Sequence, residues 1–135
     1  MTFFPDGTRY ETWAGELGEV VAIGWLDPAE PFPLGVVPAE LLDALLPLIA
    51  NPVNMTRGWH ICQFCPQPAD AFPEPLTVET PDGPAILGSA EIHIDGRGGD
   101  RYVAPTLIHH YIQAHRYAPP PSFVDAVLSR RTTEN

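Results

Sequence analysis

The stretch Trp59-His60-Ile61-Cys62-Gln63-Phe64-Cys65-Pro66 holds both cysteines of the chain, spaced as C-x-x-C. A second stretch, residues 107–115 (LIHHYIQAH), contains the spacing H-x-x-x-x-H. Thiolate sulfur and imidazole nitrogen are preferred ligands of zinc, and one tetrahedral ion can hold two such pairs. The two stretches therefore predict a site for Zn²⁺ made by four residues, namely Cys62, Cys65, His110 and His115.

The choice among the histidines depends on helix geometry. On an ideal helix His110 and His115 lie about 140° apart, so their rings converge only where the last turn tightens or frays. His109 and His115 lie about 120° apart on the other side, which leaves that pair open. We choose His110 because His109 should share the solvent side with Gln113. His60, beside the cysteines, could replace a ligand or contact one, and His93 should lie on the surface.

Other readings of the cysteine pair remain open at this point. A thioredoxin-like dithiol is one, although this C-x-x-C does not open a helix after a strand and Pro66 follows it. Buried cysteines with incidental helical histidines are another. A catalytic zinc would keep three protein ligands and use Glu91 or Asp95 as a base, but the chain has no H-E-x-x-H motif.

Length and composition indicate a single compact domain over residues 1–135. The chain is 44% hydrophobic and 18% charged, which is enough apolar material for one core and too short a length for two. All seven basic residues are arginine, and alanine, glycine and proline are frequent. This usage is typical of a bacterial protein encoded in a GC-rich genome.

The charge is strongly negative and unevenly spread. The net charge is −10, and residues 1–50 carry eight acidic side chains against Arg9 alone. Residues 96–131 carry five arginines against two aspartates. Binding of nucleic acid is not expected, because phosphate contacts need clustered basic residues. A basic protein partner fits the sign of the charge, and a role in solubility alone is the competing explanation.

No segment of the sequence reads as a membrane span or as a targeting signal. Residues 1–7 (MTFFPDG) have neither a basic region nor an apolar one, and no run elsewhere reaches about 18 apolar residues. We therefore expect a cytoplasmic protein without membrane contact. In that reducing compartment a lone C-x-x-C favours metal binding or redox chemistry over a structural disulfide.

Strand and helix patterns alternate along the chain and predict an α+β fold with about three helices. Pro5-Asp6-Gly7 should turn a hairpin between residues 3–4 and the stretch from Arg9 to Trp13, and residues 19–25 should form a strand. A leucine-rich helix should begin near Pro38, be kinked or ended by Pro47, and close at Asn51-Pro52. Its core face should carry Leu41, Leu42, Leu45, Leu48 and Ile49.

The second half should add a strand at 76–79 that is followed by a Pro81-Asp82-Gly83 turn. It should also add a strand at 91–95 and a return strand at 101–104 that completes a hairpin with residues 91–95. Pro105 should start the helix that carries the histidines. Ser122 should cap a final helix whose Phe123, Val127 and Leu128 face inward.

Residues 62–65 form the C-x-x-C turn, which we call the cysteine knuckle. A loop, a hairpin and the helix with the histidines should follow it, and this order resembles a treble-clef zinc module. The usual module takes both helical ligands from the first turn, whereas this chain would use positions 110 and 115. Residues 59–66, 87–92 and 102–120 together resemble a family of small uncharacterised bacterial proteins. The resemblance covers the chain from residue 24 onward, adds weight to the four ligands, and implies no activity.

Two functions from different classes follow from these patterns. The first is a zinc-stabilised binding protein, an immunity or regulatory factor whose acidic first half meets a basic protein surface. The second is a small zinc-dependent hydrolase. The ligand sphere discriminates between them, because four protein ligands leave no position for a reactive water.

Overall fold

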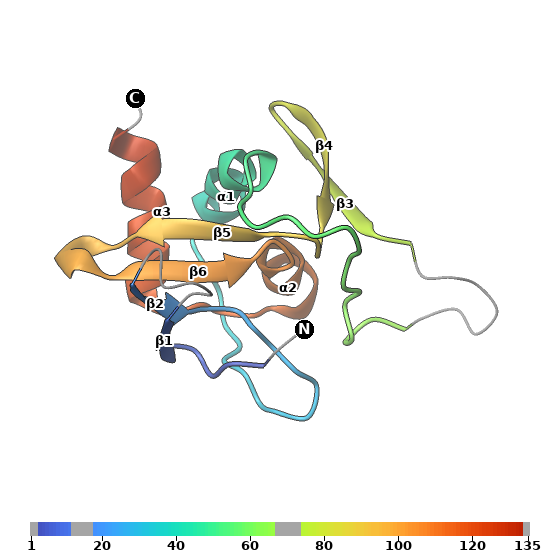
Figure 1. Cartoon of the computed structure of the whole chain (residues 1–135), viewed down its shortest axis with the longest axis horizontal. Coiled ribbons are helices and arrows are strands. Elements are labelled where there is room, and N and C mark those ends of the chain that lie inside the picture. Colours follow the sequence, from blue (N-terminus) through green and yellow to red (C-terminus); the bar gives the residue numbers. More distant parts are fainter. Residues whose placement is uncertain (1–2, 12–17, 67–73, 134–135) are drawn as a thin grey trace.

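The computed structural model describes residues 3–11, 18–66 and 74–133 of the chain. These residues form helices and two small sheets, which confirms the α+β prediction (Figure 1). In chain order the elements are β1 (Arg9–Glu11), β2 (Glu19–Ala22), α1 (Glu40–Ala50), β3 (Leu76–Thr80), β4 (Gly83–Leu87), β5 (Glu91–Asp95), β6 (Arg101–Pro105), α2 (Ile108–His115) and α3 (Pro121–Thr133).

The larger sheet has the strand order β1-β2-β6-β5. Strands β2 and β6 are parallel, with Val21 opposite Tyr102, while both outer pairs are antiparallel. The two central strands are the more buried, as expected where a strand has neighbours on both sides. The chain between residues 22 and 101 therefore connects two adjacent parallel strands, β2 and β6.

The amino-terminal hairpin was predicted with the wrong partner. The Pro5-Asp6-Gly7 turn does form, since the Thr8 N–H donates to the Pro5 carbonyl at 3.1 Å. The segment before the turn, however, bonds to the chain beyond β2, where Phe4 N–H donates to the carbonyl of Trp25. Strand β1 pairs with β2. Both flanks of the turn therefore pair with the chain between residues 19 and 25 and not with each other. Trp13 lies outside the described residues.

The hairpin of β5 and β6 confirms the alternation seen in the sequence. Ile92 and Ile94 are each 1% exposed and point into the core. His93, expected on the surface, is instead mostly covered: its side chain is 12% exposed and its Nε2 lies 3.0 Å from Oε1 of Glu91. The outer face of this strand is thus itself partly covered, which period-two alternation cannot indicate.

Helix α1 buries Leu41, Leu45 and Leu48 on the predicted core face, whereas Leu42 is half-buried. It begins at Glu40, two residues after Pro38, and continues past Pro47 to Ala50. Of the two predicted outcomes, a kink or an end at Pro47, the second is therefore wrong. The carbonyl that Pro47 leaves without a helical donor belongs to Asp43, an exposed residue that water can reach. The helix closes at Asn51 as expected, with Asn51 Nδ2 donating to the Pro47 carbonyl.

The starts of the last two helices differ from the predictions. Pro105 is the last residue of β6, and Thr106 N–H extends the ladder by donating to the Ala90 carbonyl at 3.0 Å. Helix α2 therefore begins later, at Ile108. Ser122 is not a cap but lies inside the first turn of α3, which Pro121 opens. Proline suits that position because its missing N–H would have no helical acceptor.

Around this framework, α1 and α3 lie side by side against β5, and the hairpin of β3 and β4 projects beside α1 (Figure 1). Its Pro81-Asp82-Gly83 turn confirms the prediction, with Thr80 Oγ1 donating to the Gly83 carbonyl at 2.7 Å. Within the described ranges, no helix combines the length and the apolar character needed to cross a membrane.

Candidate metal centre

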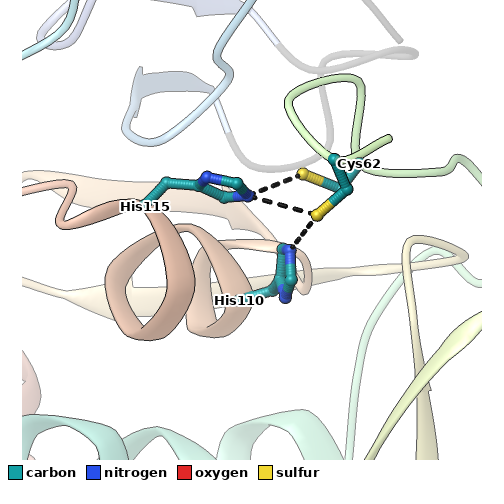
Figure 2. Close-up of side chains that lie close together, drawn as sticks. Cys62, His110 and His115 are labelled. Atoms are coloured by element: carbon teal, nitrogen blue, oxygen red, sulfur yellow. Dashed lines mark hydrogen bonds between the residues drawn. The ribbon is translucent and has the colours of Figure 1, made fainter. Parts of the chain in front are cut away.

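The structure brings the four predicted donors together. One ligand atom each from Cys62, Cys65, His110 and His115 lies within 4.8 Å of all the others. Sγ of Cys62 lies 3.3 Å from Nε2 of His115, and Sγ of Cys65 lies 3.2 Å from Nε2 of His110 and 3.4 Å from that of His115. Figure 2 shows both imidazoles of α2 turned toward the sulfur atoms.

These distances fit one tetrahedral ion. Bond lengths of about 2.3 Å for zinc to sulfur and about 2.0–2.1 Å for zinc to nitrogen give an edge of about 3.6 Å between sulfur and nitrogen. The three sulfur–nitrogen distances, 3.2–3.4 Å, fall slightly below that edge. An ion could therefore enter with a small outward movement of the side chains. The donor set, two sulfurs and two imidazole nitrogens, is that of structural zinc sites.

A short segment, residues 53–60, holds the cysteine knuckle in place; we call it the strap. It runs along the β5 side of the sheet: Val53 forms a bridge with Glu91, Thr56 N–H donates to the Ser89 carbonyl, and His60 N–H donates to the Gly88 carbonyl. Gly88 has a φ of +102°, and a Cβ there would lie 2.3 Å from the His60 carbonyl oxygen. Glycine is needed where the strap approaches so closely.

The end of α2 explains how His110 and His115 face the same ion. Arg116 adopts left-handed backbone angles, and its N–H donates to the Tyr111 carbonyl, five residues back. A backbone hydrogen bond to the fifth residue back closes a wider turn than the bond to the fourth residue back in an α-helix. Each residue then rotates less about the helix axis, so side chains five residues apart lie on the same side of the helix. The last turn thus widens, where the sequence suggested tightening or fraying. The predicted pair of histidines nevertheless converges.

Electrostatics at the cluster favour an ion over free side chains. Burial raises the pKa of the Cys62 thiol to about 11, so without an ion that thiol keeps its proton at neutral pH. Burial lowers the pKa of His110, which leaves its imidazole neutral and able to act as a ligand. A divalent cation would displace the thiol proton and offset the burial of the charged sulfur.

Aromatic side chains cover one side of the cluster. The ring of Phe64, which lies between the two cysteines in sequence, packs 5.5 Å from the ring of His115 and 5.8 Å from that of Tyr111. Phe32 packs against Phe64 in turn, at 5.2 Å. Such packing covers one side of the cluster and restricts the orientation of the His115 imidazole.

A second connection near the cluster escaped the sequence analysis. The Tyr117 hydroxyl donates to Oδ2 of Asp6 at 2.7 Å, and the Gly24 N–H donates to Oδ1 of the same carboxylate at 2.9 Å. We call this connection the phenol anchor. Tyr117 is 0% exposed, and burial, reinforced by the charge of Asp6, raises the pKa of its hydroxyl. The sequence around Asp6 indicates only a turn, and no local pattern pairs Asp6 with a residue 111 positions away.

The other candidate residues lie outside the cluster. His109 is only 4% exposed, so the prediction that it faces solvent is wrong; burial lowers its pKa, and the charge of Asp43 on α1 opposes that shift. His60 is exposed and supplies no atom to the four-residue group. Glu91 bonds to Asn54 and His93, and Asp95 bonds to Arg101, so neither candidate base belongs to the cluster.

Comparisons with known proteins give a family and no further relatives. Neither the curated proteins nor the solved structures gave a match. A family model matches residues 2–128, which confirms the resemblance to an uncharacterised family. The chain belongs to the family described as a domain of unknown function, DUF7919.

Proposed function

We propose that this protein binds one zinc ion through Cys62, Cys65, His110 and His115 and that the ion stabilises the fold. The observation that carries the proposal is the convergence of two sulfurs and two imidazole nitrogens within 4.8 Å. The ion would supply bonds between two parts of the chain that are far apart in sequence. The ring of Phe64 packs against that of His115 and restricts its orientation.

The donor set supports a structural role over a catalytic one. A zinc enzyme usually keeps three protein ligands and one position for water, with a carboxylate nearby as base. Four protein donors would fill the tetrahedron, and the carboxylates of Glu91 and Asp95 are engaged elsewhere. We therefore prefer the structural site to the zinc-dependent hydrolase.

The sequence separations explain what such an ion would contribute. Cys62 and His115 are 53 residues apart, and Cys65 and His110 are 45 apart. The chain has 17 prolines, and long irregular segments connect its short elements. Binding of structural zinc can supply on the order of 10 kcal/mol of apparent folding free energy, which is comparable to the whole stability of a small domain.

We further propose that the zinc-bound protein is a cytoplasmic bacterial binding protein, an immunity or regulatory factor, that recognises a basic protein surface. The net charge of −10 and the concentration of acidic residues in the first 50 positions support this role. Glu30, Glu40 and Asp43 are all exposed and available for contact. Opposite charges on two partners speed their encounter and exclude wrong partners.

Elemental analysis of the purified protein tests the metal. We expect about one zinc per chain, and a lower melting temperature after incubation with a strong chelator. Substitution His60→Gln provides the control, since His60 lies beside the knuckle but outside the cluster. A protein that contains no metal and melts unchanged in chelator would overturn the structural site.

A pull-down at two salt concentrations tests the partner. We expect a basic protein to be retained at about 50 mM salt and released at about 500 mM, because screening weakens exposed charge pairs. The double variant Glu30→Gln/Glu40→Gln should retain less of it than Glu79→Gln, which changes an exposed charge on β3. Retention of no protein, or retention that ignores salt, would contradict this binding role while leaving the zinc site untouched.

A further inference from the structure

A pocket of about 470 Å³ lies apart from the four metal donors. Its walls come from four regions of the chain: the amino-terminal segment with β1, Trp25 just after β2, the strap, and residues 88–91 together with Pro105 at the end of β6. The residues that matter for its chemistry are Phe4, Tyr10, Trp25, Asn54, His60 and Glu91. The volume falls within the range of small-molecule sites.

Three aromatic rings form a connected wall of this pocket. The rings of Phe4 and Tyr10 are stacked, with centroids 4.9 Å apart and an interplanar angle of 7°. Trp25 meets Phe4 edge-on at 6.2 Å and 86°. The indole of Trp25 is also fixed in orientation, because its Nε1 donates to the Val103 carbonyl at 3.0 Å. The wall is therefore held in place before any ligand arrives.

The carboxylate of Glu91 is the charged group of the pocket. Its side chain is 18% exposed, and Oε1 accepts hydrogen bonds from Asn54 Nδ2 and His93 Nε2. Among the described residues, none donates to Oε2. Both hydrogen bonds thus orient the carboxylate through Oε1 and leave Oε2 for a ligand.

The carboxylate and the aromatic wall share one electrostatic environment. The pKa of the Tyr10 hydroxyl is raised to about 12, first by burial and then by the negative charge of Glu91. No arginine lines the pocket in the described part of the chain. An anion would therefore meet repulsion from Glu91 and from the negative faces of the rings.

We propose that this pocket binds an organic ammonium group. Aromatic faces attract such a cation through the ring quadrupole, and a neighbouring carboxylate supplies the opposite charge. The apolar carbons of the ligand would pack against the rings while the positive centre faces Glu91. A bare metal cation fits less well, because hard ions need six or more oxygen ligands and the pocket offers one carboxylate.

This inference does not depend on zinc or on a protein partner. The pocket lies between the sheet and the strap, and its charged group is not a metal donor. Failure of zinc binding would leave the prediction for ammonium binding unchanged. Failure of ammonium binding would likewise leave the metal site intact.

Titration with choline, followed by the indole ¹H–¹⁵N signal of Trp25 in the NMR spectrum, tests the proposal directly. The chain has three tryptophans, so the signal is first assigned with Trp25→Phe. The neutral compound 3,3-dimethylbutan-1-ol has the shape of choline without its charge and serves as the matched ligand. We expect choline to shift the Trp25 signal with an affinity at least about threefold higher than that of the neutral compound.

Substitutions in the pocket identify the groups responsible. Glu91→Gln removes the charge while keeping an oxygen for Asn54 and His93, and Tyr10→Leu removes one ring of the wall. Each should weaken choline binding by about three- to thirtyfold, whereas Glu79→Gln, the same change on an exposed strand, should leave it unaltered. Equal affinity for both ligands, no shift at about 50 mM choline, or an unaffected Glu91→Gln variant would overturn the proposal.

The ammonium group could belong to a free small molecule or to a modified lysine of another protein, and the same assay separates the two. A short peptide with one trimethyllysine is compared with choline. Binding of the peptide at least about tenfold more tightly than choline would identify a protein-borne ligand, because the flanking residues would then add contacts. Equal or weaker binding of the peptide would identify a free one.

Discussion

The carboxyl-terminal end of α2 is attached to the rest of the molecule in two different ways. His115 reaches the cysteine knuckle, and together with His110 it forms the cluster that we call the metal clamp. Two residues later, Tyr117 donates its hydroxyl to Asp6 in the phenol anchor. In our proposal the clamp requires an ion, whereas the anchor is complete with protein groups alone.

The two attachments should differ in how much their contribution to stability depends on a metal ion. Without an ion the clamp is a set of four polar side chains packed beside aromatic rings, and it should contribute little. The anchor contributes in every metal state, but only by the modest net amount of a buried hydrogen bond to a charged group. We therefore expect the clamp to decide whether the protein folds, and the anchor to adjust its stability.

Loss of the clamp should have the largest effect. Substitution Cys62→Ser removes one of the four proposed ligands, so we expect an insoluble or largely unfolded protein. The reason is that structural zinc contributes on the order of 10 kcal/mol, about the full stability of a small domain. Circular dichroism and elemental analysis check this outcome; a soluble, folded and zinc-free variant would show that the clamp is dispensable.

Disruption of the strap should have the next largest effect, because the strap positions the knuckle. In Gly88→Ala the new Cβ would meet the His60 carbonyl oxygen at 2.3 Å, at a φ of +102°. We expect a loss of about 2–4 kcal/mol in the free energy of unfolding, measured with urea. Gly83→Ala is the matched control, because Gly83 has a φ of +104° and open space around it. Equal losses in the two variants would mean that close approach of the strap is unimportant.

Removal of the anchor should have a smaller effect. Tyr117→Phe deletes the hydroxyl that bonds to Asp6, and we expect a loss of about 1–3 kcal/mol with the zinc content unchanged. Tyr102→Phe removes the same atom from another buried ring, for which the described residues give no such bond, and should be nearly neutral. If the Tyr117 variant lost its zinc, the two attachments would not be separable as we suggest.

Alkaline pH should weaken the anchor by the smallest amount. Tyrosine ionises near pH 10 in the unfolded chain. Burial, followed by the charge of Asp6, raises the pKa of Tyr117 above that value. Burial also raises the pKa of Tyr10 to about 12. A raised folded pKa means that the stabilisation is complete below pH 10 and declines as the pH rises above it.

The decline should amount to at most about 1.4 kcal/mol per pH unit for Tyr117. We expect the urea-measured stability of the zinc-loaded protein to fall between pH 10 and 11, and to fall less steeply in Tyr117→Phe. Parallel slopes in the two proteins would show that Tyr117 titrates alike in the folded and unfolded states.

The features that the sequence predicted well are local in the chain. The spacing C-x-x-C and the histidines five residues apart led to the four residues that converge in the structure, although their binding of an ion stays a prediction. Alternation over residues 91–95 led to a hairpin, and the leucine spacing of α1 led to its buried face. Each of these signals is contained within a few neighbouring residues.

The features that the sequence did not predict depend on contacts between residues that are far apart in the chain. Helical geometry placed His109 on the solvent side of α2, but α1 packs against that helix and covers it. Pro105 looked like a helix start because proline suits that position, yet β5 offered it a place at the end of a strand. The pairing of Asp6 with Tyr117 joins two common residue types with no recurring spacing. In each case tertiary contacts outweighed the local preference.

The parallel pairing of β2 with β6 sets the order in which the chain can assemble. The contact between Trp25 and Val103 spans 78 residues, whereas Cys65 and His110 are 45 apart. Bringing chain ends together costs more entropy the longer the intervening loop, so the local β5–β6 hairpin should form first and the central strand should join last. An ion captured in between would shorten the remaining loop, and refolding should be faster with zinc present from the start than with zinc added afterwards.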